Sequence, residues 1–156
     1  MDRERRLQQI VGRLRAHHYR LTPQRMAVLE ALLRDARHPS AEEIYRELQP
    51  TYPMMSPATV YKTLATLKEL GEVLELGFSD GHNRYDAYTP RSHPHLICRH
   101  CGRIEDYPLE EFDHLVARVA AQSGYRDLTA RLDFLGVCRA CSANTPSPAT
   151  QTAGYS

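Results

Sequence analysis

Residues 56–88 decide the fold of this chain, and they read SPATVYKTLATLKELGEVLELGFSDGHNRYDAY. Ser56 followed by a proline is typical of the first turn of a helix. Apolar residues then recur at helical spacing as far as Gly71, a typical helix stop. Beyond this glycine, two short strand-like segments flank the turn pair Asp80-Gly81, so they predict a β-hairpin. These segments are residues 73–78 and 84–88. A helix followed by such a hairpin is typical of a winged helix.

Three more helices are predicted upstream of this stretch. Apolar residues at helical spacing predict the first helix, which ends near His18. Thr22 and Pro23 are an N-cap and a first-turn proline, and they open the second helix. Ser40 and Glu43 have the spacing of a capping box, and they open the third. These helices complete the helical part of a winged helix.

A winged-helix DNA-binding domain over residues 1–88 would use the helix that begins near Ser56 as its recognition element. The polar side chains of this helix can bind phosphates or base edges. The alternative is an ordinary amphipathic helix with a polar outer face. A net charge of +1 favours neither interpretation, and a solvated basic helix also explains the arginines near the amino end. The candidate DNA contacts are Arg15, Arg20, Thr22, Arg25, Ser56, Thr59, Tyr61, Lys62 and Thr63.

All four cysteines of the chain fall into two Cys-x-x-Cys pairs, Cys98 with Cys101 and Cys138 with Cys141. Each pair can bind one metal ion from a tight turn. Two pairs complete a closed tetrahedral shell of sulfurs, which is typical of structural zinc. Two disulfides or a redox pair are the alternative. The charged amino-terminal stretch, without an apolar signal segment, favours a cytoplasmic protein and therefore Zn²⁺.

The chain beyond the hairpin is predicted to form a small α+β domain over residues 89–142, which makes the whole chain α+β. A domain of this size buries little core, so we expect it to pack against a second copy as a homodimer. Dimerisation also suits DNA binding, because two recognition helices read two half-sites. Residues 143–156 are rich in Pro, Thr, Ser and Ala, and they predict a disordered tail. The predicted elements of the domain are strands at 95–98, 104–107 and 131–137 and a helix from Leu109 to Ala121.

Histidines and carboxylates predict a second metal site. His93 and His95 alternate on one strand-like segment, so their side chains point to the same face. Asp106 follows on the next strand, Asp86 lies near the end of the hairpin, and His38 is the candidate from the first domain. Nitrogen and oxygen ligands without sulfur suit iron(II), manganese(II) or zinc. For any one of these histidines, a hydrogen-bonded surface imidazole is the alternative.

Other classes of function find less support in the sequence. No apolar run is long enough to cross a bilayer, so no membrane association is expected. Two histidines with a carboxylate also describe the ligands of iron oxygenases, so a small iron metalloenzyme is a remote alternative. No segment suggests a nucleophile or a phosphate-binding loop. We therefore expect neither enzymatic activity nor a small organic substrate.

Five motifs lie within about residues 7–141 of the chain. They are Leu21-Thr22-Pro23-Gln24-Arg25, His38-Pro39-Ser40-Ala41, Ser56-Pro57-Ala58-Thr59-Val60-Tyr61, Asn83-Arg84-Tyr85-Asp86, and His93-x-His95-Leu96-Ile97-Cys98-x-x-Cys101-Gly102. Over this range and in these motifs, the chain resembles the ferric uptake regulator (Fur) family, bacterial metal-responsive repressors with a winged-helix domain and a dimerisation domain.

The resemblance implies the roles of the candidate ligands. Structural zinc would be bound by the four cysteines, and regulatory iron(II) or manganese(II) by His38, Asp86, His93, His95 and Asp106. Aspartate at positions 86 and 106 resembles the peroxide-sensing branch of the family, whereas iron-uptake repressors usually carry glutamate there. In that branch peroxide oxidises a ligand histidine at the positions of His38 and His93, which releases operator DNA. An iron- or manganese-uptake regulator without peroxide chemistry is the alternative.

Overall fold

The computed structural model describes residues 2–34, 38–78 and 81–143. Asp80 of the predicted turn and residues 144–156 of the predicted tail lie outside the described residues. The chain divides into two compact units, Met1–Ser92 and His93–Ser156. Within the described residues, no helix is both long and apolar enough to span a membrane.

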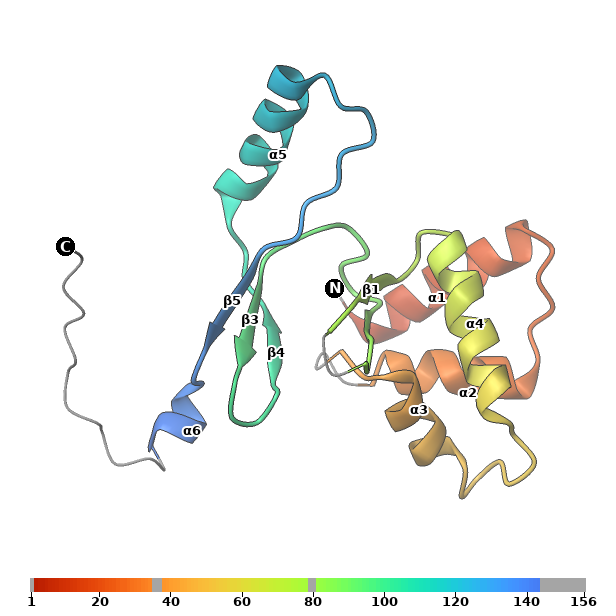
Figure 1. Cartoon of the computed structure of the whole chain (residues 1–156). Helices are drawn as coiled ribbons and strands as arrows, with labels where there is room; N and C mark the ends of the chain where they lie inside the picture. The colour runs from red at the N-terminus through yellow and green to blue at the C-terminus, as the bar shows by residue number, and fades with distance from the viewer. Residues whose placement is uncertain (1, 35–37, 79–80, 144–156) are drawn as a thin grey trace. The chain divides into compact units, whose positions relative to one another are not determined.

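The first unit consists of four helices followed by a two-stranded hairpin, as a winged helix requires (Figure 1). The hairpin strands pair antiparallel with Leu74 opposite Asp86. This arrangement agrees with the predicted order of elements, and the second, third and fourth helices begin at or next to their predicted starts. The elements are α1 (Arg3–Ala16), α2 (Pro23–Leu32), α3 (Ala41–Leu48), α4 (Pro57–Glu69), β1 (Leu74–Leu76) and β2 (Arg84–Asp86).

Local capping explains where two of these helices begin. The Thr22 side chain accepts a hydrogen bond from the backbone N–H of Arg25 at 3.2 Å, and this bond caps α2. Ser40 and Glu43 form the predicted capping box of α3. Such caps satisfy backbone N–H groups that have no partner inside the helix. Ser56 precedes α4 as predicted, but its side chain makes no capping bond and lies 3.3 Å from the Thr59 hydroxyl.

A continuous apolar core holds the first unit together, and one arginine is buried beside it. Ile10 and Leu14 of α1, Leu29 of α2 and Leu64 of α4 are at most 1% exposed. Arg6 is 5% exposed, so it does not belong to a solvated basic face. Its guanidinium binds the Glu72 carboxylate at 2.8 Å and the Ala87 carbonyl at 2.6 Å. These bonds fix α1 to the segment just before β1 and to the segment just beyond β2.

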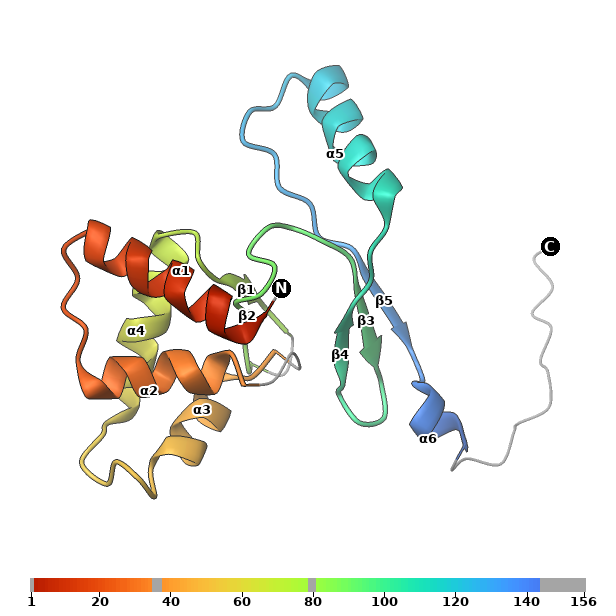
Figure 2. The ribbon, with the colours of Figure 1, turned by 180° about the vertical axis from the view of Figure 1, so that it is seen from behind.

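The second unit has a three-stranded sheet in the order β4-β3-β5 (Figures 1 and 2). Strand β3 pairs antiparallel with β4 and parallel with β5. Helix α5 lies beyond one end of the strands and α6 beyond the other, so neither helix covers a face of the sheet. Gly124 ends α5 with φ 71°, the left-handed conformation that glycine favours. The elements are β3 (His95–Cys98), β4 (Ile104–Asp106), α5 (Glu110–Ser123), β5 (Asp133–Gly136) and α6 (Arg139–Ala143).

The core of the second unit is small. Among its described residues, Cys98, Ile104 and Phe112 form the buried hydrophobic core. By contrast, many large apolar side chains of the unit are more than a third exposed: Leu96, Tyr107, Leu115, Val119, Tyr125, Phe134, Leu135 and Val137. Burial of apolar surface is the main source of folding free energy, so this unit needs other stabilising contacts.

Candidate metal centres and DNA interface

The four cysteines gather at one end of the sheet in the second unit. Cys98 ends β3, and a tight turn with Gly102 at φ 70° brings Cys101 back beside it. Cys138 follows β5, and Cys141 lies on α6. Parallel pairing of β3 with β5 joins the two pairs, because it places Cys98 opposite Gly136. The four sulfur atoms lie within 4.8 Å of one another.

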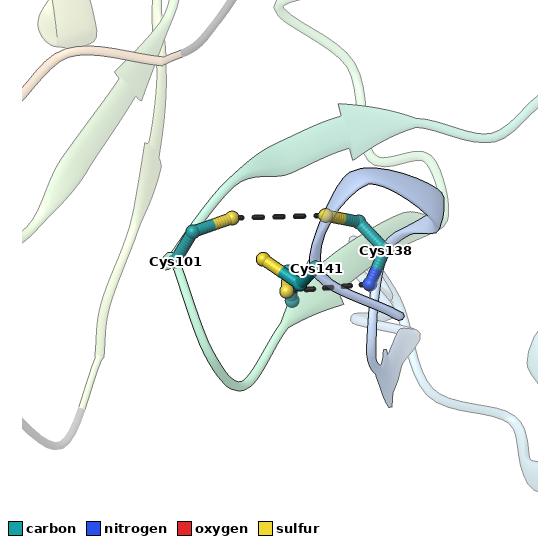
Figure 3. A group of neighbouring side chains, drawn as sticks. Cys101, Cys138 and Cys141 are labelled. Carbon is teal, nitrogen blue, oxygen red and sulfur yellow. Dashed lines mark hydrogen bonds between the residues drawn. The ribbon is translucent and has the colours of Figure 1, made fainter. Parts of the chain in front are cut away.

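Sulfur geometry favours a shared metal ion over disulfides. The Sγ atoms of Cys101 and Cys138, which a dashed line joins in Figure 3, are 3.8 Å apart, whereas a disulfide bond is about 2.05 Å long. Two sulfurs bound to one zinc ion at about 2.3 Å can be this far apart. The donors fit Zn²⁺, which prefers four thiolates in a closed tetrahedral site.

The thiols already differ in acidity in this cluster. The backbone N–H of Cys138 donates to the Cys98 sulfur at 3.3 Å, and this bond, with one from Cys101, lowers the pKa of Cys98 to about 6. Hydrogen bonds with Cys138 and Cys101 raise the pKa of Cys141 to about 12. Four adjacent thiolates repel one another, so a divalent cation is needed to keep them all ionised.

Two histidines and an aspartate form a second cluster in the second unit. His93 Nε2 lies 3.1 Å from Asp106 Oδ1, and His95 Nε2 lies 4.0 Å from the same oxygen. Ligands about 2.1 Å from one ion are at most about 4.2 Å apart, so both distances fit a shared ion. His95 is 1% exposed. The cluster offers two nitrogens and a carboxylate, a donor set that suits iron(II), manganese(II) or zinc.

Asp133 also belongs to this cluster, although the sequence predicted only that Asp133 lies in a strand. Its Oδ1 lies 3.6 Å from His95 Nδ1, and its Oδ2 accepts a hydrogen bond from Arg131 Nε at 2.6 Å. Asp133 is opposite His95 in the parallel pairing of β3 with β5. The alternation of Arg131 and Asp133 along a predicted strand was the available signal, but the pairing partner could not be read from it.

The other two predicted ligands, His38 and Asp86, lie in the first unit and are 3% and 1% exposed. The His38 backbone has φ 55°, a left-handed conformation that is uncommon for residues other than glycine. Oδ1 of Asp86 accepts hydrogen bonds from the backbone N–H groups of Tyr88 at 2.8 Å and Thr89 at 3.2 Å. These bonds fix the orientation of the carboxylate at the end of β2.

The predicted DNA contacts fall into three groups. Arg15, Arg20, Ser56, Tyr61 and Lys62 are exposed. Thr22, Arg25 and Thr59 are partly buried. Two of them already make contacts within the protein: Thr22 caps α2, and Arg25 Nη1 donates a hydrogen bond to the Arg20 carbonyl at 2.6 Å. Thr63 is 2% exposed, and its hydroxyl donates to the Thr59 carbonyl at 2.8 Å. A buried hydroxyl with an internal acceptor cannot reach a DNA groove, so we omit Thr63 from the interface.

An acidic residue lies beside the predicted recognition helix. The Tyr61 hydroxyl donates a hydrogen bond to Glu42 of α3. This bond lowers the pKa of Glu42 and raises that of Tyr61, because it stabilises the carboxylate and retains the phenol proton. The Tyr61 hydroxyl must therefore leave Glu42 before it can donate to DNA.

A winged helix joined to a small unit with a four-cysteine cluster and a histidine–aspartate cluster defines the class of metal-dependent DNA-binding regulators. The chain belongs to the Ferric uptake regulator family, whose model matches residues 16–135. Members of this family are transcription regulators and not enzymes, so the expectation of no enzymatic activity is confirmed.

Proteins similar to this chain include both peroxide regulators and a ferric uptake regulator. The peroxide-responsive repressor PerR of Staphylococcus aureus is 37% identical over 139 residues, which cover 88% of this chain and 93% of that protein. The Campylobacter jejuni peroxide stress regulator has a solved structure that is 33% identical with a TM-score of 0.65, covering 84% of this chain and 98% of that one. The Vibrio cholerae ferric uptake regulator is 27% identical with a TM-score of 0.64, covering 80% and 96%.

Proposed function

We propose that this chain is a cytoplasmic transcriptional repressor that binds double-stranded operator DNA as a homodimer when iron(II) or manganese(II) occupies a regulatory site. We further propose that hydrogen peroxide abolishes this binding. The observation that carries the proposal is the cluster of His93, His95 and Asp106 at metal-ligand separations. The resemblance to a peroxide-responsive repressor at 37% identity supports the peroxide branch.

In the proposed regulatory site, His38 and Asp86 of the first unit bind the same ion as His93, His95 and Asp106 of the second. Shared ligands would restrict the orientation of one unit relative to the other. DNA binding is favoured if that orientation sets the two recognition helices at the half-site separation. The free energy by which metal strengthens DNA binding then equals the difference between the metal-binding free energy of this orientation and that of the other orientations.

Two features support the other parts of the proposal. Cys98, Cys101, Cys138 and Cys141 would bind structural Zn²⁺, because their four sulfurs form a closed cluster. The exposed apolar side chains Leu96 of β3 and Phe134 of β5 lie opposite each other on one face of the sheet, and they would be buried against a second copy. Such burial compensates for the small core of the second unit.

Bound iron(II) would supply the reaction with hydrogen peroxide. The contribution of the chain is to hold an imidazole beside the site of reaction, at His38 or His93. One oxygen atom of the peroxide is added to the imidazole ring, and the other leaves as water. The oxidised ring is a poorer ligand, so metal and then DNA are released.

Operator binding by the zinc-loaded protein under anaerobic conditions tests this function. We expect iron(II) and manganese(II) each to promote binding, and stoichiometric peroxide to abolish it only in the iron form. Peptide mass spectrometry of the same samples should then find one added oxygen on the peptide with His38 or His93. If both metal forms keep DNA and no histidine is oxidised, the protein is an iron- or manganese-uptake regulator instead.

Tyr61→Phe is expected to weaken specific operator binding about fivefold, because one hydrogen bond contributes about 1 kcal/mol. The measurement is a DNA titration with operator and with unrelated duplex of equal length. Tyr45→Phe, on the neighbouring helix α3, is the control and should leave both affinities unchanged. An unaltered affinity and footprint for Tyr61→Phe would remove this hydroxyl from the proposed interface.

A further inference from the structure

We propose that Asp133 is a positioning residue of the regulatory site. Its carboxylate accepts a hydrogen bond from Nδ1–H of His95 and thereby presents Nε2 of the same ring to the metal ion. This inference rests on the proposed function, because it assumes that His95 is a ligand.

Strand pairing places His95 between two aspartates. His95 lies on the central strand β3, opposite Asp106 of β4 on one side and Asp133 of β5 on the other. Directly opposite residues of paired strands point to the same face of a sheet. The imidazole therefore has a carboxylate on each side.

Each ring nitrogen of His95 faces a different carboxylate. Nε2 lies 4.0 Å from Asp106 Oδ1, and Nδ1 lies 3.6 Å from Asp133 Oδ1. The first distance fits two ligands of one ion, since neither group needs to contact the other directly. The second is slightly longer than a hydrogen bond, and a shift of about 0.5 Å closes it. The two aspartates therefore have different roles, one as a ligand and one as an acceptor behind the ring.

The surroundings of Asp133 hold it in this position. Its second oxygen, Oδ2, binds Arg131 Nε at 2.6 Å, which leaves Oδ1 directed at His95. The His95 ring is 1% exposed, so bulk water has little access to take over the role of acceptor. A carboxylate behind a metal-binding histidine selects the tautomer, fixes the ring and makes the ligand nitrogen more basic.

Asp133→Asn tests this role, with Glu105→Gln as a matched control. Glu105 also lies in this sheet and pairs with an arginine two residues earlier, Arg103, at 2.8 Å. This ion pair resembles that of Asp133 with Arg131, so the control removes an equivalent ion pair. Mn²⁺ affinity of the zinc-loaded protein is measured by titration calorimetry and by electron paramagnetic resonance. We expect a 10- to 100-fold loss for Asp133→Asn, as for other groups behind metal ligands, and a change below about twofold for Glu105→Gln.

If Asp133 had only a structural role, Asp133→Asn would change the melting temperature or the zinc content of the Mn²⁺-free protein. The melting temperature and zinc content of Mn²⁺-free Asp133→Asn are expected to match those of Glu105→Gln. Equal losses of Mn²⁺ affinity in the two variants would overturn the proposal, as would wild-type affinity in Asp133→Asn. If wild-type protein itself bound no Mn²⁺, both the regulatory site and this inference would fall.

The tautomer of His95 provides a readout that needs neither metal nor a variant. Long-range proton–nitrogen NMR of Mn²⁺-free wild-type protein should show neutral His95 with its proton on Nδ1. A proton on Nε2 would overturn the proposal even if Asp133→Asn failed to fold. Asp133→Ala is expected to convert this single tautomer into a mixture.

Discussion

Replacement of Cys138 by serine is expected to unfold the second unit, His93–Ser156, and to abolish the dimer with it. Structural zinc contributes about 10 to 16 kcal/mol in small sites, which matches the whole stability of a domain this size. The unit has a small apolar core, so little else opposes unfolding. Hydrogen exchange should show loss of protection in β3 and β5, while α1 to α4 stay protected by their own core.

Ser142→Ala is the matched control for this prediction. Ser142 lies on α6 beside the cluster and donates to the Cys138 carbonyl at 3.0 Å, but it offers no sulfur. We expect it to keep one zinc ion per chain and to lose at most about 1 kcal/mol from one hydrogen bond. A chelator added to wild-type protein should reproduce the effect of Cys138→Ser. A zinc-free Cys138→Ser protein with a native melting curve would contradict the structural role of the cluster.

His38→Ala is expected to keep the fold and the zinc, and to abolish metal-dependent operator binding. In the proposed site, His38 is one of two ligands from the first unit, and its loss would uncouple metal binding from the orientation of the units. Operator affinity is measured with and without Mn²⁺. Reciprocity adds a second test, because operator DNA should tighten Mn²⁺ binding of wild-type protein by the same factor and should have no such effect in the variant.

His18→Ala is the control for backbone strain. His18 has φ 61°, close to the 55° of His38, but its side chain is exposed. If replacing a histidine in the left-handed backbone conformation were enough to impair operator binding, both variants would therefore show the loss. We expect His18→Ala to keep its response to Mn²⁺. An unchanged response in His38→Ala would remove His38 from the regulatory site.

The starts of α2, α3 and α4 could be predicted from sequence because their signals are local. Thr22 and the pair Ser40 and Glu43 cap backbone groups within three residues of themselves. The change from helical to alternating periodicity after Gly71 likewise located the hairpin. The burial of single side chains was harder to predict, because a short segment of sequence does not show which other elements pack over it. Arg6 and Thr63 read as surface residues, yet both are buried.

The candidate metal centres also include features that the sequence predicts and features that it does not. Two clusters could be predicted from the sequence, one of the four cysteines and one of His93, His95 and Asp106, because spacing along a turn or a strand limits which side chains can converge. Two other contacts were found only in the folded structure: Asp133 faces His95, and Glu42 accepts the hydrogen bond of the Tyr61 hydroxyl. Both contacts join residues that are distant in the sequence. β4 and α5 lie between His95 and Asp133, and the loop from α3 to α4 lies between Glu42 and Tyr61. The geometry of these contacts depends on strand register and helix packing, which arise from the whole fold and are not encoded in any local pattern.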